Sequence, residues 1–422
     1  MSDSVRSCSK DRSLERPHEK THRQIVVPME LEEYHAIWAN PKKVREKIAE
    51  VMAAHPELFP AAMRNAGYHL TGFTKASKKL GQDIRLRQVR VGSTRYYLRP
   101  SFVMKHHSGF VEDLEHPLFL LSIGVPPWAV TRVFGKNDMY WHRHVERLGR
   151  NSVVGTTIAA SDSIPKHIAA DEHHAKWAGA KGYVGMTVGE GCILGIGLSD
   201  GADEESLKAV YGDFKEESTI LEPEYNPVTV NTDGWTATGN AFIYLFSTVT
   251  VILCFLHGFL KIRNRGRKEK ELHTRVWDAY KEPTVEAFRA KIVELASWVE
   301  TAMLRPALLY SVKRLVDRAD RYAKSYDHPE CLRTSNMVDR LMNRLTRFLY
   351  DGRGLHGHQE TSELRLRGWA LIRNFTPYAP RSNLSREYES PAHAINKKQY
   401  HCNWLHNLNV ATSLGGYRNF ST

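Results

Sequence analysis

Hydrophobic and polar positions follow two different periods along the chain, and the pattern changes near residue 152. Before that point, residues 31–80 carry apolar residues at helical spacing, whereas 84–100 alternate like a β-hairpin with Gly92–Ser93 at its turn. After it, short apolar runs separated by glycines predict β-strands, and a stretch beyond residue 259 returns to helical spacing. The pattern predicts an α/β protein with a mainly α N-terminal region and a late helical block.

Five apolar runs in the middle of the chain are short enough to be buried strands. They cover residues 167–171, 181–188, 192–199, 227–233 and 249–257. Amphipathic helices are predicted between them, over 203–217 and about 236–246. Three strands, a helix, a strand, a helix and a strand is the order of an RNase H-like sheet. We therefore expect an RNase H-like mixed sheet with an all-helical insertion.

Residues 116–135 have the spacing of two short helices joined by a turn at Gly124, with Pro127 at the start of the second helix. The apolar residues expected to face inward are Phe119, Leu120, Ile123, Val125, Val130 and Val133. Two interpretations stay open. A DNA-binding helix-turn-helix would place Arg132 at the DNA, whereas an ordinary helical hairpin would have no such role.

Residues 241–260 are nearly apolar and precede the basic stretch 261–268, a combination that resembles a transmembrane helix. However, Ser247 and Thr248 interrupt the stretch, and the β-branched run 248–253 favours a buried strand. We therefore expect no membrane span, with a membrane-anchored protein as the alternative.

The charge balance points to a polyanionic partner. The chain has 59 Lys and Arg against 47 Asp and Glu, a net charge of +12, and such an excess usually serves nucleic acid or an anionic surface. Its five cysteines form no C-x-x-C pair, which indicates a reducing compartment and argues against a Cys-rich zinc module. Besides Arg132, the basic residues expected to contact DNA phosphates are Lys261, Arg263, Arg265, Arg267, Arg340 and Arg344.

These patterns divide the chain into six segments. We expect a flexible polar arm at 1–28, an N-terminal DNA-recognition region at 29–151, the first part of the RNase H-like core at 152–258, the helical insertion at 259–330, the final core helices at 331–377 and a loop-rich C-terminal tail at 378–422.

Two acidic residues stand where metal ligands are expected. Asp171 ends the first predicted strand and Asp233 ends the fourth, each after apolar residues, where a carboxylate is costly unless it faces solvent or a metal ion. Taken singly, either could be an ordinary polar strand end. As a pair in these two strands, they favour a divalent-cation site.

Four short motifs make the pattern more specific. ADEHH at 170–174, VNTDGW at 230–235, CFLH at 254–257 and TSNMVDRLMNR at 334–344 resemble the Mutator-like group of DDE transposases, over about residues 155–375. The resemblance implies that Asp339 is the third catalytic carboxylate and that Cys254, His257 and Asn336 shape the site. The group normally has Glu where this chain has Asp339, so Glu363 is the substitute candidate.

The resemblance implies a transposase that cuts the ends of a mobile element and joins them to target DNA. Asp171, Asp233 and Asp339 would hold two Mg²⁺ ions, with Mn²⁺ able to substitute. The expected partner is double-stranded DNA, bound by a homodimer or higher oligomer, and the expected location is cytoplasmic and nucleoid-associated. An RNase H-like nuclease without strand transfer, and a transposase-derived DNA-binding protein without catalysis, remain alternatives.

Overall fold

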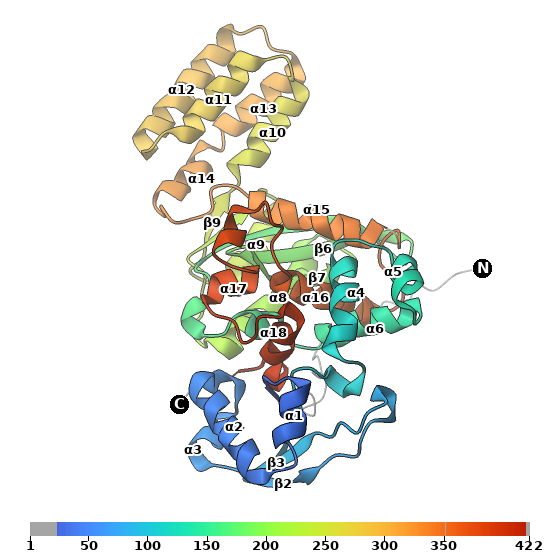
Figure 1. Ribbon diagram of the computed structural model, residues 1–422. Helices are drawn as coiled ribbons and strands as arrows, with labels where there is room; N and C mark the ends of the chain where they lie inside the picture. The colour runs from blue at the N-terminus through green and yellow to red at the C-terminus, as the bar shows by residue number, and fades with distance from the viewer. Residues whose placement is uncertain (1–22, 351, 419–422) are drawn as a thin grey trace, which may run out of the picture.

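A five-stranded mixed sheet forms the centre of the molecule (Figure 1). The structure is a computed structural model that describes residues 23–350 and 352–418. In spatial order the strands are β7 (Cys192–Ser199), β6 (Ala180–Gly189), β5 (His167–Trp177), β8 (Thr229–Thr232) and β9 (Thr250–Leu253). β6 runs antiparallel to β5 and β7, whereas β5, β8 and β9 are parallel. The five predicted strands are all present, and the mixed α/β class is confirmed.

Helices cover both faces of this sheet, and the period of two along β5 decides which side chains meet them. Ile168 and Ala170 join the core that α8 (Glu204–Leu221) and α9 (Thr236–Leu245) complete. Ala169 points to the opposite face, into the core formed with α15 (Asn336–Tyr350) and α16 (Gln359–Phe375). Asp171 is two residues after Ala169 on the same strand, so its side chain points to the same face of the sheet, toward α15.

A separate group of helices stands between β9 and α15 and projects from the sheet (Figure 1). It comprises α10 (Phe255–Arg265), α11 (Lys270–Lys281), α12 (Val285–Thr301), α13 (Pro306–Val316) and α14 (Ala319–Ala323). These helices share a core of their own that includes Phe288 and Leu295. The helical insertion is present, although its first helix begins at Phe255, before the predicted boundary at 259.

Residues 241–260 are divided among α9, β9 and α10. Within the described part of the chain, no helix combines the length and apolar character that a bilayer crossing requires.

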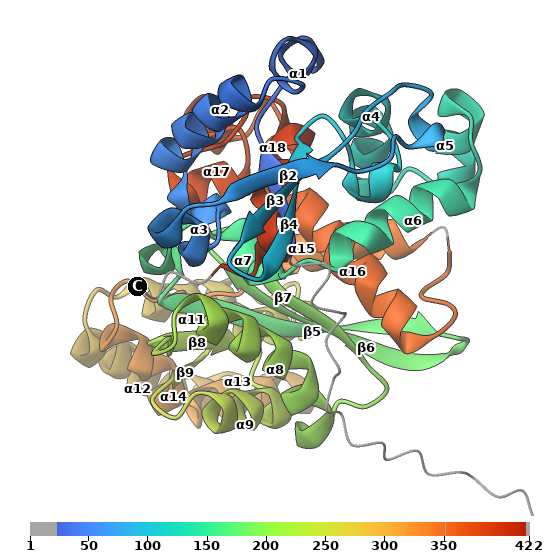
Figure 2. The ribbon, with the colours of Figure 1, turned by 90° about the horizontal axis from the view of Figure 1, so that it is seen from below.

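The N-terminal region contains a second, four-stranded sheet in the order β1-β4-β3-β2 (Figure 2). Its strands are β1 (Gln24–Val27), β2 (His69–Phe73), β3 (Arg87–Val91) and β4 (Thr94–Pro100). Helices α1 (Leu31–Ile37), α2 (Pro41–Ala54) and α3 (Ala61–Ala66) accompany it. The hairpin with Gly92–Ser93 at its turn is confirmed. Residues 24–27, predicted as the end of a flexible arm, instead pair with β4; the rest of the arm, 1–22, lies outside the described residues.

Three further helices connect the two sheets: α4 (Val111–Ser122), α5 (Pro127–Phe134) and α6 (Asp138–Gly149). They are followed by the short α7 (Val153–Thr157). The helix–turn–helix spacing over 116–135 is present as α4 and α5, but two residues expected to face inward do not. Ile123 is 45% exposed and Val133 is 73% exposed, while Val130 is buried as expected. Val130 is the only buried residue of α5, so this helix turns one narrow face inward.

The C-terminal segment differs from the loop-rich tail predicted for 378–422. It contains α17 (Pro391–Asn396) and α18 (Trp404–Ala411), and α18 is buried along its whole length. Val410 and Leu414 belong to the core of the N-terminal sheet. Trp404 and Leu408 belong instead to the core beside the central sheet, so the segment joins the two cores.

Candidate functional site

The parallel pairing of β5 and β8 brings the first two acidic residues together. Ala169 pairs with Asn231, so continuing the same register by two residues places Asp171 beside Asp233. Gly234 follows with φ +92°, and a Cβ there would lie 2.4 Å from Leu253 Cδ1, so the turn that presents Asp233 requires glycine.

The third acidic residue approaches from α15, on the face of the sheet toward which Asp171 points. Ligand atoms of Asp171, His257 and Asp339 all lie within 4.8 Å of one another. His257 stands in the first turn of α10, directly after β9. Residues from β5, α10 and α15 thus converge at the ends of the parallel strands. Asp233 lies next to this group, but its Oδ1 accepts a hydrogen bond of 2.7 Å from the backbone N–H of Trp235.

Ser335 ties the motif residues together. It is fully buried, and its hydroxyl donates to Asp339 Oδ2 at 3.0 Å while lying 3.2 Å from both His257 Nδ1 and Cys254 Sγ. Its backbone N–H donates to Cys254 Sγ at 3.2 Å. Because Cys254 is fully buried, its sulfur positions the start of α15 and is not accessible as a nucleophile.

Burial and the charges of neighbouring carboxylates change the pKa values of this group. Burial, followed by the charges of Asp233 and Glu172, raises the pKa of Asp171 to about 7. A hydrogen bond to Cys254, helped by the charges of Asp339 and Asp171, raises the pKa of His257 to about 9. An added cation would relieve the repulsion that raises the pKa of Asp171.

The donor set fits a hard divalent cation. Carboxylate oxygens from Asp171 and Asp339, with Asp233 adjacent, are ligands of the kind that Mg²⁺ and Mn²⁺ prefer. His257 Nε2 lies 4.0 Å from Asp339 Oδ1 while Nδ1 faces Ser335. This histidine is placed to orient Asp339, in addition to any direct contact with an ion.

Two further residues at the site were not predicted. One is Ser335. The other is Glu172, which points to the opposite face of β5, where it accepts hydrogen bonds from Tyr211 Oη and from Thr238 Oγ1, at 2.5 and 2.7 Å. Burial raises the pKa of Glu172. The alternation along β5 could have indicated that an acid directly after Asp171 points into the α8 core; Ser335 had the weaker signal of a serine just before a helix.

The remaining predicted site residues occupy different surroundings. Asn336 is exposed at the start of α15, away from the hydrogen bonds that Ser335 makes. Glu363 lies on α16, where it accepts a hydrogen bond of 2.8 Å from Gln359, a residue that also contacts Leu198 at the end of β7. The structure therefore brings Asp339 to Asp171, and it does not bring Glu363 there.

The predicted basic residues are all exposed, but they differ in the contacts that they make with the rest of the protein. Arg340, Arg344 and Arg347 share one stripe of α15, a set that we call the α15 arginine row. Burial, followed by the charges of Arg347 and Arg340, lowers the pKa of Arg344. In α10, Arg265 donates to Ala307 O and Ser311 Oγ.

Lys261, Arg263 and Arg267 are exposed on and just after α10, and Arg132 is exposed on α5. Arg265 therefore has a structural role in holding α13, whereas no such contact to α13 is seen for its three exposed neighbours among the described residues.

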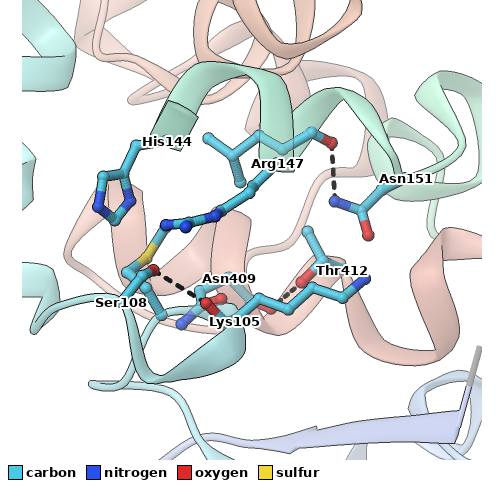
Figure 3. Close-up of a pocket in the computed structure, with 9 residues that line it drawn as sticks. Lys105, Ser108, His144, Arg147, Asn151, Asn409 and Thr412 are labelled. Carbon is cyan, nitrogen blue, oxygen red and sulfur yellow. Dashed lines mark hydrogen bonds between the residues drawn. The ribbon is translucent and has the colours of Figure 1, made fainter. Parts of the chain in front are cut away.

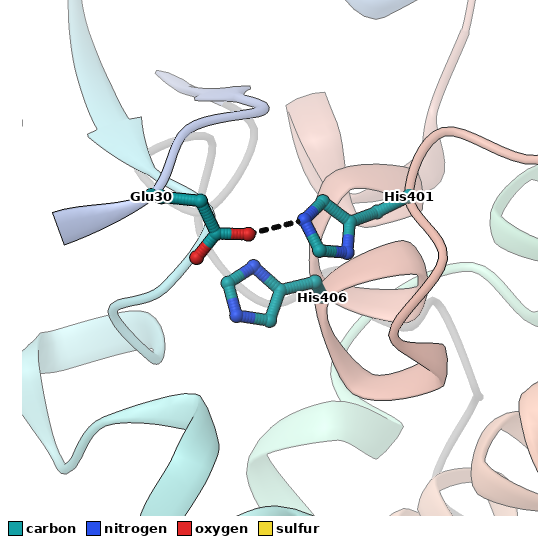
Figure 4. A group of neighbouring side chains, drawn as sticks. All are labelled: Glu30, His401 and His406. Carbon is teal, nitrogen blue, oxygen red and sulfur yellow. Dashed lines mark hydrogen bonds and ion pairs between the residues drawn. The ribbon is translucent and has the colours of Figure 1, made fainter. Parts of the chain in front are cut away.

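A second group of potential metal ligands joins the two ends of the described chain: Glu30, His401 and His406 (Figure 4). The backbone N–H of Asn403 donates to His401 Nδ1, which leaves the ring proton on Nε2, and Nε2 pairs with Glu30 at 2.7 Å. His406 Nδ1 contacts Ser101 Oγ at 3.1 Å. Since His401 has no lone pair toward the group, these residues form a hydrogen-bonded clasp and a poor metal site.

Models of known protein families give no match to this chain, and a search of curated proteins finds no significant relative.

Proposed function

We propose that this protein is a metal-dependent DNA-cutting and DNA-joining enzyme, a DDE-type transposase with an RNase H-like core. The observation that carries the proposal is the convergence of Asp171 and Asp339 beside Asp233. The strand order β7-β6-β5-β8-β9, with β6 antiparallel, is what an RNase H-like sheet requires, and it supports the assignment. The resemblance of the four motifs to Mutator-like transposases supplies the reaction class.

The chemistry follows from the charges of the site. Two divalent cations held by the three aspartates would activate the attacking oxygen and stabilise the leaving oxygen of an in-line phosphoryl transfer. Asp171, Asp233 and Asp339 contribute the negative charge that holds such ions, and Ser335 and His257 fix the orientation of Asp339. The α15 arginine row begins one residue after Asp339 and offers phosphate contacts beside the acids. Water attack at the element end would free a 3′-OH, which then attacks target DNA in the same pocket.

The proposal also includes recognition by the N-terminal region and assembly of two or more copies on DNA. Exposed Arg132 on α5 supports the first of these, because a short helix that presents an arginine to solvent can reach base edges.

The test uses full-length protein and duplex DNA that carries the sequences flanking its own gene, with Mg²⁺ or Mn²⁺. We expect nicks at fixed positions that leave 3′-OH ends, followed by joined products when target DNA is added. Nicking without joined products would indicate a nuclease, and tight DNA binding without metal-dependent nicking would indicate a non-catalytic DNA-binding protein. Either result would overturn the proposal.

The matched control is Asp200→Asn, which alters an exposed acid in the loop after β7. It should nick at the wild-type rate. This control separates the loss of a site carboxylate from the loss of one surface charge.

A further inference from the structure

A cationic pocket lies between the segment before α4, α6 and the end of α18 (Figure 3). Its lining residues are Met104, Lys105, Ser108, His144, Arg147, Leu148, Asn151, Asn409 and Thr412. None of these nine is acidic. Lys105 and Arg147 extend into the pocket from opposite sides, Lys105 from the loop and Arg147 from α6.

Most polar groups of the lining are already engaged within the protein. Asn151 Nδ2 donates to Leu148 O, and Asn409 Nδ2 donates to the carbonyls of Ser101 and Val103. The hydroxyls of Ser108 and Thr412 donate to the carbonyls of Lys105 and Asn409. Among the described residues, the groups of the lining left for a ligand are the two cations and two buried neutral atoms without a hydrogen-bond partner, His144 Nε2 and Asn151 Oδ1, so positive charge dominates what the pocket offers.

Lys105 is 8% exposed, and the part of the chain that the structure describes offers its ammonium group no carboxylate. Burial, together with the charges of Arg99 and Arg150, lowers the pKa of Lys105 to about 7. Arg99 is almost fully buried as well, and it donates hydrogen bonds to Val103 O, Asn409 Oδ1 and Thr412 Oγ1, which are all neutral. A buried cation without a counter-charge is costly, and such a cluster is stabilised when an anion binds.

The surface beside the pocket extends the same charge. Arg143 and Arg147 on α6 and Arg150, its C-cap residue, stand at i, i+4 and i+7, which puts them on one stripe, and Arg143 and Arg150 are exposed. We call this set the α6 arginine row. A row of arginines spaced along a helix follows a chain of phosphates better than it surrounds one small ion.

We propose that this pocket binds a phosphate group through Lys105 and Arg147, and that the phosphate belongs to a DNA backbone lying along the α6 arginine row. The choice of DNA as the source rests on the proposed function. The phosphate chemistry does not, because it follows from the unpaired cations alone.

The experiment uses the full-length protein without added metal, so its outcome does not depend on nicking. Inorganic phosphate is the first probe, read as a rise in Tm over chloride at equal ionic strength. A 30-base-pair duplex is the second probe, read by fluorescence anisotropy over a salt series. Lys105→Met keeps most of the length of the side chain and removes the charge, and Arg147→Gln probes the opposite wall. Lys42→Met, at an exposed position on α2, is the matched control.

Wild type and Lys42→Met should show the phosphate-dependent rise in Tm, and Lys105→Met and Arg147→Gln should lose it. Both pocket variants should bind the duplex about tenfold more weakly, with the salt slope reduced by about one. If the phosphate response is lost while duplex affinity is unchanged, the pocket takes a free phosphate compound and the DNA assignment is overturned. If both pocket variants keep the wild-type phosphate response and duplex affinity, the whole proposal is overturned. Arg147 is half-exposed, so its variant remains informative even if Lys105→Met does not fold.

Discussion

The charged form of Asp171 is disfavoured by burial and by repulsion from Asp233 and Glu172. Replacing it with asparagine removes a metal ligand and also removes the repulsion. We therefore expect Asp171→Asn to lose nicking by several orders of magnitude while DNA binding survives, and to be at least as stable as wild type without metal. Nicking gels and thermal unfolding measure the two effects. Metal-dependent nicking at the wild-type rate would show that Asp171 is not a ligand.

Ser335 touches Asp339, His257 and Cys254 at once, so it should tune the site without binding substrate. We expect Ser335→Ala to lower the nicking rate about 10- to 100-fold, with a higher metal concentration needed for half-maximal rate. Ser335→Thr should recover part of the loss, because it keeps the hydroxyl. Ser325→Ala is the control, since Ser325 is equally buried but donates to Tyr322 O within the insertion. An unchanged metal requirement in Ser335→Ala would leave Ser335 with a purely structural role.

Lys105 gives a pH-dependent prediction for stability. Its pKa is lowered from 10.5 to about 7 by burial and then by Arg99 and Arg150. Arg147 and His144 also line the pocket, and His144, whose pKa is lowered to about 4 by burial and by the charge of Arg147, is neutral over the relevant range. Between about pH 7 and 10.5 the unfolded chain holds a proton that the folded chain has released, so this group makes stability rise with pH. Below about pH 7 the full penalty of a buried charge remains.

Lys105→Met removes that penalty. We expect the variant to be more stable than wild type in phosphate-free buffer, with the difference largest at about pH 6 and shrinking toward about pH 10. Urea unfolding at both ends of this range measures it. Lys42→Met should show a small difference that does not change with pH, because Lys42 is exposed. A constant difference for Lys105→Met would mean that Lys105 titrates normally in the folded protein.

At the scale of single residues, the sequence was informative where a polar side chain interrupts an apolar pattern. Asp171 and Asp233 were singled out in this way, and their closeness follows from the parallel pairing of β5 and β8. Asp339 needed the motif resemblance, because a polar stripe on a helix is usually a solvated face. Ser335 was missed, since a serine just before a helix is a weak signal and its contacts with the distant Cys254 and His257 leave no periodic pattern.

Among the secondary-structure elements, strands and long helices were predictable because their burial is periodic. The hairpin of β3 and β4 and all strands of the central sheet show this. α18 was missed because it is buried on all sides. Its polar and apolar residues therefore do not separate into the two faces that predict an amphipathic helix. The polar residues are used in hydrogen bonds to other parts of the chain, for example from Asn409 to Ser101 O. Such bonds appear only once the fold is complete.

Among the helices, α5 has an exposed face that leads to a testable prediction. Arg132 is exposed, and Trp128, four residues earlier on the same face, is 62% exposed. A face with an arginine and an exposed aromatic ring is suited to base edges. We expect Arg132→Ala to lower the preference for element-end DNA over scrambled DNA by about 1–3 kcal/mol, with affinity for scrambled DNA nearly unchanged. Competition binding at fixed salt measures the preference.

Arg263→Ala is the comparison variant, because Arg263 is an exposed arginine on α10. It should weaken binding to both DNAs alike and lower the salt slope by about one. If Arg132→Ala behaves in the same way, α4 and α5 form an ordinary helical hairpin, and recognition lies elsewhere.

For the molecule as a whole, the main feature that the sequence did not predict is that the two ends of the described chain pack against each other. The buried Arg99 guanidinium of β4 donates to Asn409 and Thr412, and the backbone N–H of Val26 donates to Ser413 Oγ at 3.1 Å. The predicted boundary at residue 151 is also crossed, because α6 packs with α16 in the core that includes Val145 and Trp369. The N-terminal region therefore depends for its stability on residues more than two hundred positions away.

Val410 tests this dependence directly. It is fully buried in the core of the N-terminal sheet, although it lies on α18. Val410→Ala should cost about 1.5–3 kcal/mol, because the lost burial is that of a core side chain. Since the contact is with the N-terminal sheet, amide hydrogen exchange should speed up in β1 and β4 as well as in α18. Val293→Ala, at a 65% exposed position on α12, should change stability by about 0.5 kcal/mol or less. Faster exchange confined to α18 would contradict this coupling, because it would show that β1 and β4 keep their protection without the C-terminal helix.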